Sequence, residues 1–202
     1  MSAAGENLRE RTRRAVRAEI VQAAMDLFLS HGFEETTVEE IAQTAGISRR
    51  SYFRYFASKD DALVEGLAAI GETIAKALEA RPFEENAWLA LRRAFDPVVH
   101  QADTDQRARA LGRLMLQHPG LQRDKDATWA NEIARALAPR LPSDQSTKIH
   151  IDALVASAIA CLHVAQEHWL APGGRGSLGA LLDETMQSLR PFDAEARHVH
   201  VE

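Results

Sequence analysis

Apolar residues recur every three or four positions along most of the chain, which is the spacing of the buried face of an amphipathic α-helix. The first predicted helix begins near Glu10 and has apolar residues on one face from Val16 to Phe28. It is expected to end at His31–Gly32. No stretch alternates β-branched and polar residues as a half-buried strand does, and Ala and Leu, which favour helices, dominate. The pattern therefore predicts an all-α protein.

Two short helices with their own capping residues follow the first one. Thr37, with Glu40 three positions later, forms a capping box, and Gly46 supplies the left-handed end of that helix. Ser48 then caps a second short helix, which is expected to run to about Phe56. Two short helices around a tight turn, behind a longer supporting helix, make a helix-turn-helix. A plain helical hairpin that binds no DNA is the alternative from this pattern.

Longer helices fill the rest of the chain. Ser58, followed by two acids, starts a helix that is expected to reach about Ala80, and Arg81–Pro82 breaks it. Prolines and glycines then separate five further predicted helices: roughly 84–101, 104–117, 122–138, 147–171 and 177–190. We expect about nine helices, divided between a three-helix N-terminal head in residues 1–60 and a larger helical body in residues 61–202.

Charge is segregated along the chain in a way that the formal net charge of −5 conceals. Residues 1–60 hold nine basic and nine acidic side chains, and the bases gather in two clusters, Arg9–Arg17 and Arg49–Lys59. Since the field that a phosphate feels is local, two such clusters on a neutral domain can bind nucleic acid.

Composition excludes several other classes of protein. Hydrophobic residues make up 46% of the chain and charged residues 26%, as in a soluble folded protein, and no apolar run is long enough for a membrane span. The N-terminus lacks the apolar segment of a secretory signal, and Cys161 is the single cysteine, so the expected setting is the reducing cytoplasm. No nucleophile–base pair, phosphate loop or metal-ligand spacing stands out, and we expect no catalytic residues, metal or cofactor.

The run from Ile20 to Leu63 resembles the DNA-binding domain of the tetracycline-repressor (TetR) family of transcriptional regulators. The resemblance is carried by the order and spacing "LF…HGF…TTVEEIA…AGIS…YF.YF.SKD.L", and it covers about the first third of the chain. It implies a homodimer whose head binds a near-palindromic DNA operator, and whose body holds a ligand pocket and the dimer interface. Such a protein is a ligand-responsive regulator, most often a repressor that a small apolar effector releases. A helical ligand-binding module or an enzyme without DNA binding is the alternative.

Carried over position by position, the resemblance implies phosphate contacts at the start of the second helix and near the end of the third, with base contacts between them. The candidate DNA-binding residues are Arg14, Thr36, Thr37, Ser48, Arg49, Arg50, Ser51, Tyr52, Tyr55 and Lys59. An arginine that bonds a guanine through two hydrogen bonds contributes roughly 1–3 kcal/mol of discrimination. We therefore expect a half-site that contains G, read by Arg49 or Arg50.

Two positions depart from the family's pattern. The recognition helix usually has a small residue where this chain has Arg50, so a second arginine is expected to reach base edges. The family's phosphate-binding tyrosine falls at Phe53, which has no hydroxyl, so this role either moves to Tyr52 or stays unfilled. Phe53 and Phe56 are expected on the buried side of the helix.

Apolar and aromatic residues in the middle of the body predict a ligand pocket. Met, Trp and Phe side chains around a cavity suit a flexible apolar ligand. The candidate contacts are Phe95, Val99, Leu111, Leu114, Met115, Trp129, Ile133, Leu162, Gln166 and Trp169. The segments from "NAWLALRRAF" to "SLGALLDETM" also resemble a C-terminal domain that binds acyl-CoA-like ligands in some members. This second resemblance suggests a fatty acyl or acyl-CoA effector, anchored by a base such as Arg92, Arg93 or Arg113.

The last two predicted helices are rich in apolar and small residues, which allow close approach of another helix. In the resembled family these two helices form a four-helix bundle with their copies in the partner. The candidate dimer-interface residues are Leu154, Ala158, Leu178, Leu182 and Met186. Packing of the same residues within one chain is the alternative.

Overall fold

The computed structural model describes residues 8–142, 147–174 and 176–189, and these residues form ten α-helices, a short 3-10 turn and no strand. The all-α prediction is confirmed. In chain order the helices are α1 (Leu8–His31), α2 (Val38–Thr44), α3 (Arg49–Tyr52), α4 (Lys59–Glu79), α5 (Ala87–Ala94), α6 (Asp96–Thr104), α7 (Gln106–Gln117), α8 (Pro119–Leu137), α9 (Thr147–Leu170) and α10 (Leu178–Ser188), with the 3-10 turn at Ala138–Arg140.

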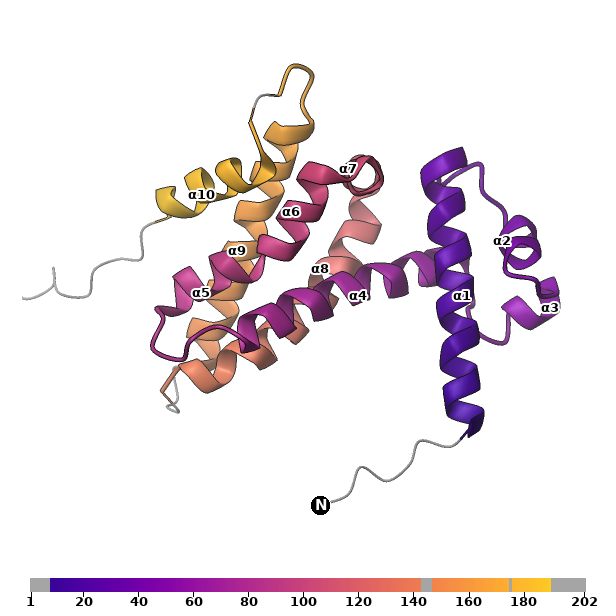
Figure 1. The fold of residues 1–202 in the computed structure, drawn as a ribbon, viewed down its shortest axis with the longest axis horizontal. Coiled ribbons are helices and arrows are strands. Elements are labelled where there is room, and N and C mark those ends of the chain that lie inside the picture. Colours follow the sequence, from indigo (N-terminus) through magenta and orange to yellow (C-terminus); the bar gives the residue numbers. More distant parts are fainter. Residues whose placement is uncertain (1–7, 143–146, 175, 190–202) are drawn as a thin grey trace, which may run out of the picture.

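The helices form two groups joined by α4. Figure 1 shows α1, α2 and α3 as a head at one end and α5 to α10 as a larger body at the other, with α4 running from one to the other. The hydrophobic core of the head includes Leu63 and Leu67 from the N-terminal half of α4, and the core of the body includes Ile74 and Leu78 from its C-terminal half. The head core also takes in residues of α7 and α8, including Met115, so head and body share buried side chains.

The N-terminal caps form as the sequence predicts. The Thr37 hydroxyl accepts a hydrogen bond from the backbone N–H of Glu40 at 3.2 Å, and the Glu40 carboxylate accepts from the backbone N–H of Thr37 at 2.8 Å. Ser58 and Asp61 form a second capping box at the start of α4. Each box satisfies backbone donors that the first turn of a helix leaves without partners.

Two predicted helix boundaries differ. The segment predicted as one helix at 84–101 forms α5 and α6, because Pro97 lacks the backbone donor that a continuing helix needs and instead begins a new one. The third head helix ends at Tyr52, not at about Phe56, and hydrogen bonds across three residues, such as that from Tyr55 N–H to the Tyr52 carbonyl, tighten the chain into a turn.

Helix α4 and helix α8 approach closely at a glycine. A Cβ atom on Gly71 would lie 2.6 Å from Cδ1 of Trp129, a separation that real side chains do not reach. The Trp129 indole N–H donates to the carbonyl oxygen of Leu67 at 2.8 Å, one turn earlier on α4. Because glycine has no side chain, Gly71 leaves room for the Trp129 indole to pack directly against α4.

The residues predicted for the dimer interface lie mostly inside the chain, and the interface itself stays a prediction. Ala158, Leu178, Leu182 and Met186 are buried inside one chain, and Leu154 is half-buried against the same core. Within the chain, α9 packs against α10 and also against α8, α7 and α5, and these helices together cover much of its apolar face.

Contrary to the expectation that no apolar run is long enough for a membrane span, helix α9 meets that requirement by length and composition alone. Many of its apolar side chains, such as Val155, Ile159 and Leu162, fill the core of the body instead. Its composition is accounted for by its central position in a folded domain.

Candidate DNA-binding surface and ligand cavity

The first turn of α3 presents polar side chains to solvent. Ser48 caps the helix by accepting a hydrogen bond from the backbone N–H of Ser51 at 3.1 Å. Arg49 and Arg50 are exposed, and Nε of Arg49 lies 2.8 Å from a carboxylate oxygen of Glu39 on α2. The capped turn therefore holds two guanidinium groups at the surface, as predicted, and Glu39 orients one of them.

The two aromatic residues next to these arginines have the opposite placement to the one predicted. Tyr52 is completely buried, and its hydroxyl donates to the carbonyl oxygen of Ser58 at 2.9 Å. Phe53 is 46% exposed, and its ring lies 5.4 Å from the Arg49 guanidinium carbon. Tyr52 and Phe56, four residues apart, share the inward side of the chain, so Tyr52 has no access to a phosphate.

Burial also changes the acidity of this tyrosine. Removal from water, with a smaller contribution from the negative charges of Asp61 and Asp60, raises the pKa of Tyr52 to about 12. The side chain is a neutral hydrogen-bond donor inside the head core.

Two of the predicted phosphate contacts have internal roles instead. Thr36 is buried, and its hydroxyl donates to the carbonyl oxygen of Gly32 at 2.7 Å, whereas Thr37 is exposed. The ammonium group of Lys59 donates to the carbonyl oxygens of Phe33, Glu34 and Thr36 at 2.7, 3.1 and 3.1 Å. Because an ammonium group has three donors, Lys59 is fully used in holding the turn between α1 and α2.

A second basic surface lies where α1 meets the turn after α3. Arg9, Arg13 and Arg54 line a surface hollow of about 660 Å³ together with Tyr55. The fold thereby places Arg54 of the second basic cluster beside Arg9 and Arg13 of the first. Arg14 is exposed on the same helix, α1.

Arg17, in contrast, acts within the head. Its guanidinium group makes two hydrogen bonds to the Glu65 carboxylate, one of them 2.9 Å from Nε, and donates to the Tyr55 carbonyl at 2.8 Å. The same group stacks 4.4 Å from the Phe56 ring centre. Arg17 therefore ties α1 to α4 and to the turn that follows α3.

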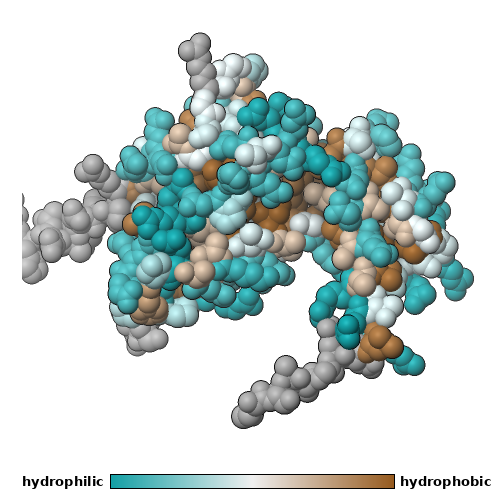
Figure 2. Space-filling model, viewed as in Figure 1, coloured by the Kyte–Doolittle hydropathy of each residue, from teal (hydrophilic) through white to brown (hydrophobic). Residues whose placement is uncertain are grey.

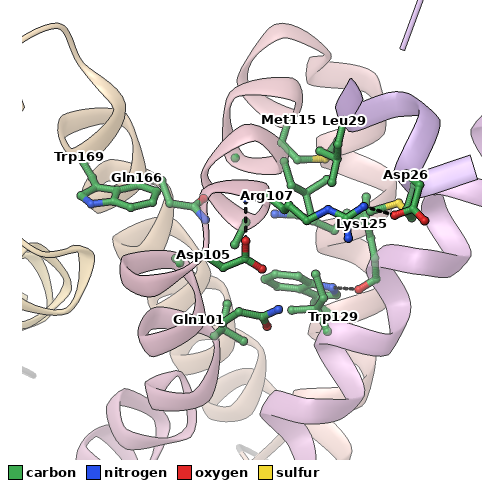
Figure 3. Close-up of a pocket in the computed structure, with 18 of the residues that line it drawn as sticks. Asp26, Leu29, Gln101, Asp105, Arg107, Met115, Lys125, Trp129, Gln166 and Trp169 are labelled. Atoms are coloured by element: carbon green, nitrogen blue, oxygen red, sulfur yellow. Dashed lines mark hydrogen bonds and ion pairs between the residues drawn. The ribbon is translucent and has the colours of Figure 1, made fainter. Parts of the chain in front are cut away.

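The body contains a cavity of about 340 Å³ that reaches the head. Helices α1, α4, α6, α7, α8 and α9 all contribute to its lining. Figure 3 shows Gln166 and Trp169 entering from α9 on one side and Asp26 and Leu29 of α1 on the other. Apolar surface gathers in the recess between the body and α1 (Figure 2).

Five of the predicted ligand contacts line this cavity: Leu111, Met115, Trp129, Gln166 and Trp169. The other five do not. Phe95, Ile133 and Leu162 are completely buried in the body core. Val99 is buried too, and its neighbour Val98 lines the cavity instead. Leu114 lines a neighbouring hollow between α1 and α7. Apolar spacing along a helix identifies the inward side, and it does not distinguish a packed core from a cavity wall.

The basic anchors proposed from the sequence lie elsewhere. Arg92 pairs with Asp183 at 2.5 Å and with Asp96 at 2.6 Å and so ties α5 to α6 and α10. Arg93 pairs with Glu85. Arg113 lines the neighbouring hollow beside Leu114.

The cavity is instead lined by two other cations, Arg107 and Lys125, which the sequence pattern did not identify as ligand contacts. Arg107 pairs with Asp26 of α1, and because their side chains are 59% and 42% exposed, this pair lies at the solvent side. Lys125 is only 3% exposed, and it lies four residues from both Leu121 and Trp129 on α8. That spacing, a lysine within an apolar stripe, is the signal that could have identified it.

Lys125 belongs to a small polar network under the cavity. Its Nζ lies 3.1 Å from Oδ1 of Asp126 and 4.3 Å from the Trp129 ring centre, and burial lowers its pKa against the opposing charge of Asp126. Burial works to raise the pKa of Asp126, but a hydrogen bond with His163 and the charge of Lys125 outweigh it and leave that pKa lowered. Within the described residues, no group of three His, Cys, Asp or Glu side chains is arranged to hold a metal ion.

Two family models match the chain. That of the bacterial regulatory proteins of the tetR family matches residues 20–65, and that of the MftR C-terminal domain matches residues 85–192. The transcriptional regulator TcmR of Streptomyces glaucescens is 31% identical over 199 residues, which cover 93% of this chain and 88% of TcmR. The mycofactocin biosynthesis regulator MftR of Mycobacterium tuberculosis is 30% identical over 161 residues, 75% of this chain and 78% of MftR.

Solved structures share the fold at lower identity. A TetR-family regulator of Streptomyces coelicolor superposes with a TM-score of 0.63 at 18% identity, over 92% of this chain and 96% of that one. FadR of Thermus thermophilus, a TetR-family repressor in complex with lauroyl-CoA, has a TM-score of 0.58 at 22% identity, over 85% and 91%. SmeT, the repressor of a Stenotrophomonas maltophilia multidrug efflux pump, has a TM-score of 0.61 at 21% identity, over 87% and 91%.

Proposed function

The chain belongs to the TetR family of ligand-responsive transcriptional regulators, and from this membership we propose that it is a homodimeric repressor released from a palindromic operator by a small apolar effector. TcmR and MftR are regulators of transcription, and we propose the same activity, without catalysis, for this chain.

The observation that carries the proposal is the surface of the head. Arg49 and Arg50 are exposed on the capped first turn of α3. The hollow lined by Arg9, Arg13 and Arg54 lies where α1 meets the turn that follows α3. Exposed guanidinium groups on such a turn can bind the edges of nucleobases in a major groove, and the flanking arginine side chains can bind phosphates. Two heads of a dimer would contact successive major grooves about one helical turn apart.

The position of the cavity supports release by an effector. Gln22, Met25, Asp26 and Leu29 of α1 line it, and α1 is the helix that supports the DNA-binding turn. A molecule that fills the cavity therefore contacts the head directly, and does not act only through the far end of the body. If it binds better to a conformation in which the two heads no longer fit the operator, it shifts the protein away from DNA.

The apolar lining favours a small apolar effector. Met25, Met115, Trp129 and Trp169 offer flexible and flat surfaces to such a molecule. The structurally similar FadR is described in complex with lauroyl-CoA, so a fatty acyl group, free or as a CoA thioester, is the effector that we propose.

The outer side of α9 is the proposed dimer interface, in place of the residues predicted from the sequence. Ala153, Ala156 and Ala160 are exposed there at helical spacing, with Ile149 and Val164 also exposed along the same side. Small side chains let two helices approach closely, and the exposed apolar ends add area to be buried.

Selection of duplexes from a random DNA library by the purified protein tests this function. We expect enrichment of a palindrome that contains G in each half, and binding that weakens steeply as salt is raised, because phosphate contacts release counterions. Recovery of no preferred sequence, with no salt-dependent binding, would overturn the proposal. Ligand binding without DNA binding would then favour the simple ligand-binding module.

A further inference from the structure

We propose that the cavity selects an effector with a single acidic group on an apolar body, and that the buried ammonium group of Lys125 binds the acid. The inference rests on the proposed ligand-responsive function and names the chemistry that the cavity recognises.

Lys125 is a cation in an apolar place. Its side chain is 3% exposed, it lines the cavity, and it extends beside Trp129, with Nζ 4.3 Å from the ring centre. The other charged side chains described in the lining, Asp26, Asp105 and Arg107, all have substantially more contact with solvent. Burying an ammonium group is costly unless it is paired, and Asp126 supplies one partner. The remaining donors of Lys125 favour an anionic group in the apolar cavity.

The neighbouring network leaves Lys125 able to bind such a partner. Oδ1 of Asp126 lies 3.1 Å from Nζ of Lys125 and 3.2 Å from Nε2 of His163. An ammonium group has three donors, and Asp126 takes one of them. If Lys125 turns toward a ligand, Asp126 keeps His163 as its partner, so the carboxylate is not left buried and alone.

The size and the charge of the cavity favour a compact monoanion. Its volume of about 340 Å³ is near the lower end of the roughly 300–1,000 Å³ found for small-molecule sites. A CoA thioester would place its phosphates outside, beside Asp26 and Asp105, where Arg107 is already paired with Asp26. The free acid offers its charge to Lys125, and the thioester does not.

A series of ligands with one ten-carbon chain and different head groups tests the proposal. Decanoate, decanol, decyltrimethylammonium and decanoyl-CoA are titrated into the full chain, with binding followed by calorimetry and by the fluorescence of the cavity tryptophans, Trp129 and Trp169. We expect decanoate to bind about tenfold or more tightly than each of the others, which is the effect of one charged hydrogen bond. Equal or tighter binding of any of the other three would overturn the proposal.

The variant Lys125→Met tests the residue, because it keeps an unbranched side chain and removes the charge. We expect its affinity for decanoate to fall about tenfold or more and its affinity for decanol to stay within about threefold. The matched control is Arg113→Met, which removes a cation from the neighbouring hollow and should leave both affinities unchanged. Unchanged decanoate binding by Lys125→Met would assign the acid to another group, and if this variant fails to fold, the head-group series decides alone.

The DNA-binding function is measured separately on the same proteins. Lys125→Met should bind the selected duplex as the unaltered protein does, yet decanoate should not release it. Absence of DNA binding in both proteins would contradict the proposed function without affecting the head-group preference. Release of Lys125→Met by the same decanoate concentration would contradict the role of Lys125.

Discussion

Single side chains in the head have either a structural or a DNA-facing role, and neighbours in sequence can differ. Tyr52 is buried with its hydroxyl bonded to the Ser58 carbonyl, while the adjacent Phe53 is exposed beside Arg49. Lys59 donates hydrogen bonds to three backbone carbonyl oxygens, and the Thr36 hydroxyl donates to a fourth. The exposed arginines of the capped turn therefore remain the residues that we propose to read bases.

Substitution of the two aromatic residues should separate these roles. Tyr52→Phe removes a buried hydrogen bond and should lower the free energy of unfolding by about 1 kcal/mol, whereas Phe53→Ala should change it by no more than about 0.5 kcal/mol. Urea denaturation of both variants measures the difference. A larger loss from Phe53→Ala would mean that the rings are placed as the sequence pattern suggested.

The raised pKa of Tyr52 predicts a dependence of stability on alkaline pH. In the unfolded chain the tyrosine loses its proton near pH 10, while in the folded protein it keeps it to about pH 12. The unfolded state then binds fewer protons, so the contribution of Tyr52 is full below pH 10 and is lost as the pH rises through 12. Relative to Tyr52→Phe, the unaltered protein should lose about 2–3 kcal/mol of unfolding free energy over this window. A constant difference between the two proteins would contradict the burial of the hydroxyl.

The two exposed arginines predict a loss of base preference. Arg49→Ala and Arg50→Ala should each reduce discrimination at one base pair by about 1–3 kcal/mol, because a bidentate contact with guanine is lost. Binding to duplexes with single base changes measures this, with Arg123→Ala, an exposed arginine on α8, as the control. A uniform loss across all duplexes would assign the arginines to phosphates.

At the scale of helices, local chemistry was a good guide where it acts within a few residues. Thr37, Ser48 and Ser58 cap their helices as expected, because a cap depends on its own turn. The phase of a short helix and the wall of a cavity depend on distant elements. The sequence pattern therefore predicts a buried Phe53 and an exposed Tyr52, whereas the structure has the reverse. It also gives no role to Lys125, although this lysine interrupts an apolar stripe.

The close approach of α4 and α8 makes its own prediction. Gly71→Ala places a methyl group against Trp129 and should lower the free energy of unfolding by about 1–3 kcal/mol. Gly120→Ala is the matched control, since nothing lies within 4 Å of its Cβ position on α8, and it should be neutral or stabilising by up to about 1 kcal/mol. Equal effects in thermal unfolding would mean that the helices do not meet at Gly71.

On the scale of the whole molecule, α1 and α4 connect the DNA-binding head with the cavity. Residues from both helices line the cavity, and the ion pair between Asp26 and Arg107 joins α1 to α7 beside it. The family resemblance predicted a head and a body. That α1 forms part of the cavity wall could not be predicted, because it depends on how the two cores meet around Met115.

The outer side of α9 gives a prediction about assembly. The double change Ala156→Glu and Ala160→Glu places two charges in the proposed interface, where an isologous dimer would bring four together. We expect a monomer in analytical ultracentrifugation and loss of tight binding to the palindrome. Ala127→Glu, at an exposed alanine on α8, should leave the dimer intact. A double variant that remains dimeric would place the interface elsewhere.

The measurement that tests the central claim most directly is the fluorescence anisotropy of the selected duplex, bound to the full chain, as decanoate is added. If the cavity controls the head, the anisotropy falls to that of free duplex over the same decanoate range in which the tryptophan fluorescence reports binding. An anisotropy that stays at the bound value while the tryptophan signal saturates would show that the cavity is occupied without releasing DNA, and would contradict the account.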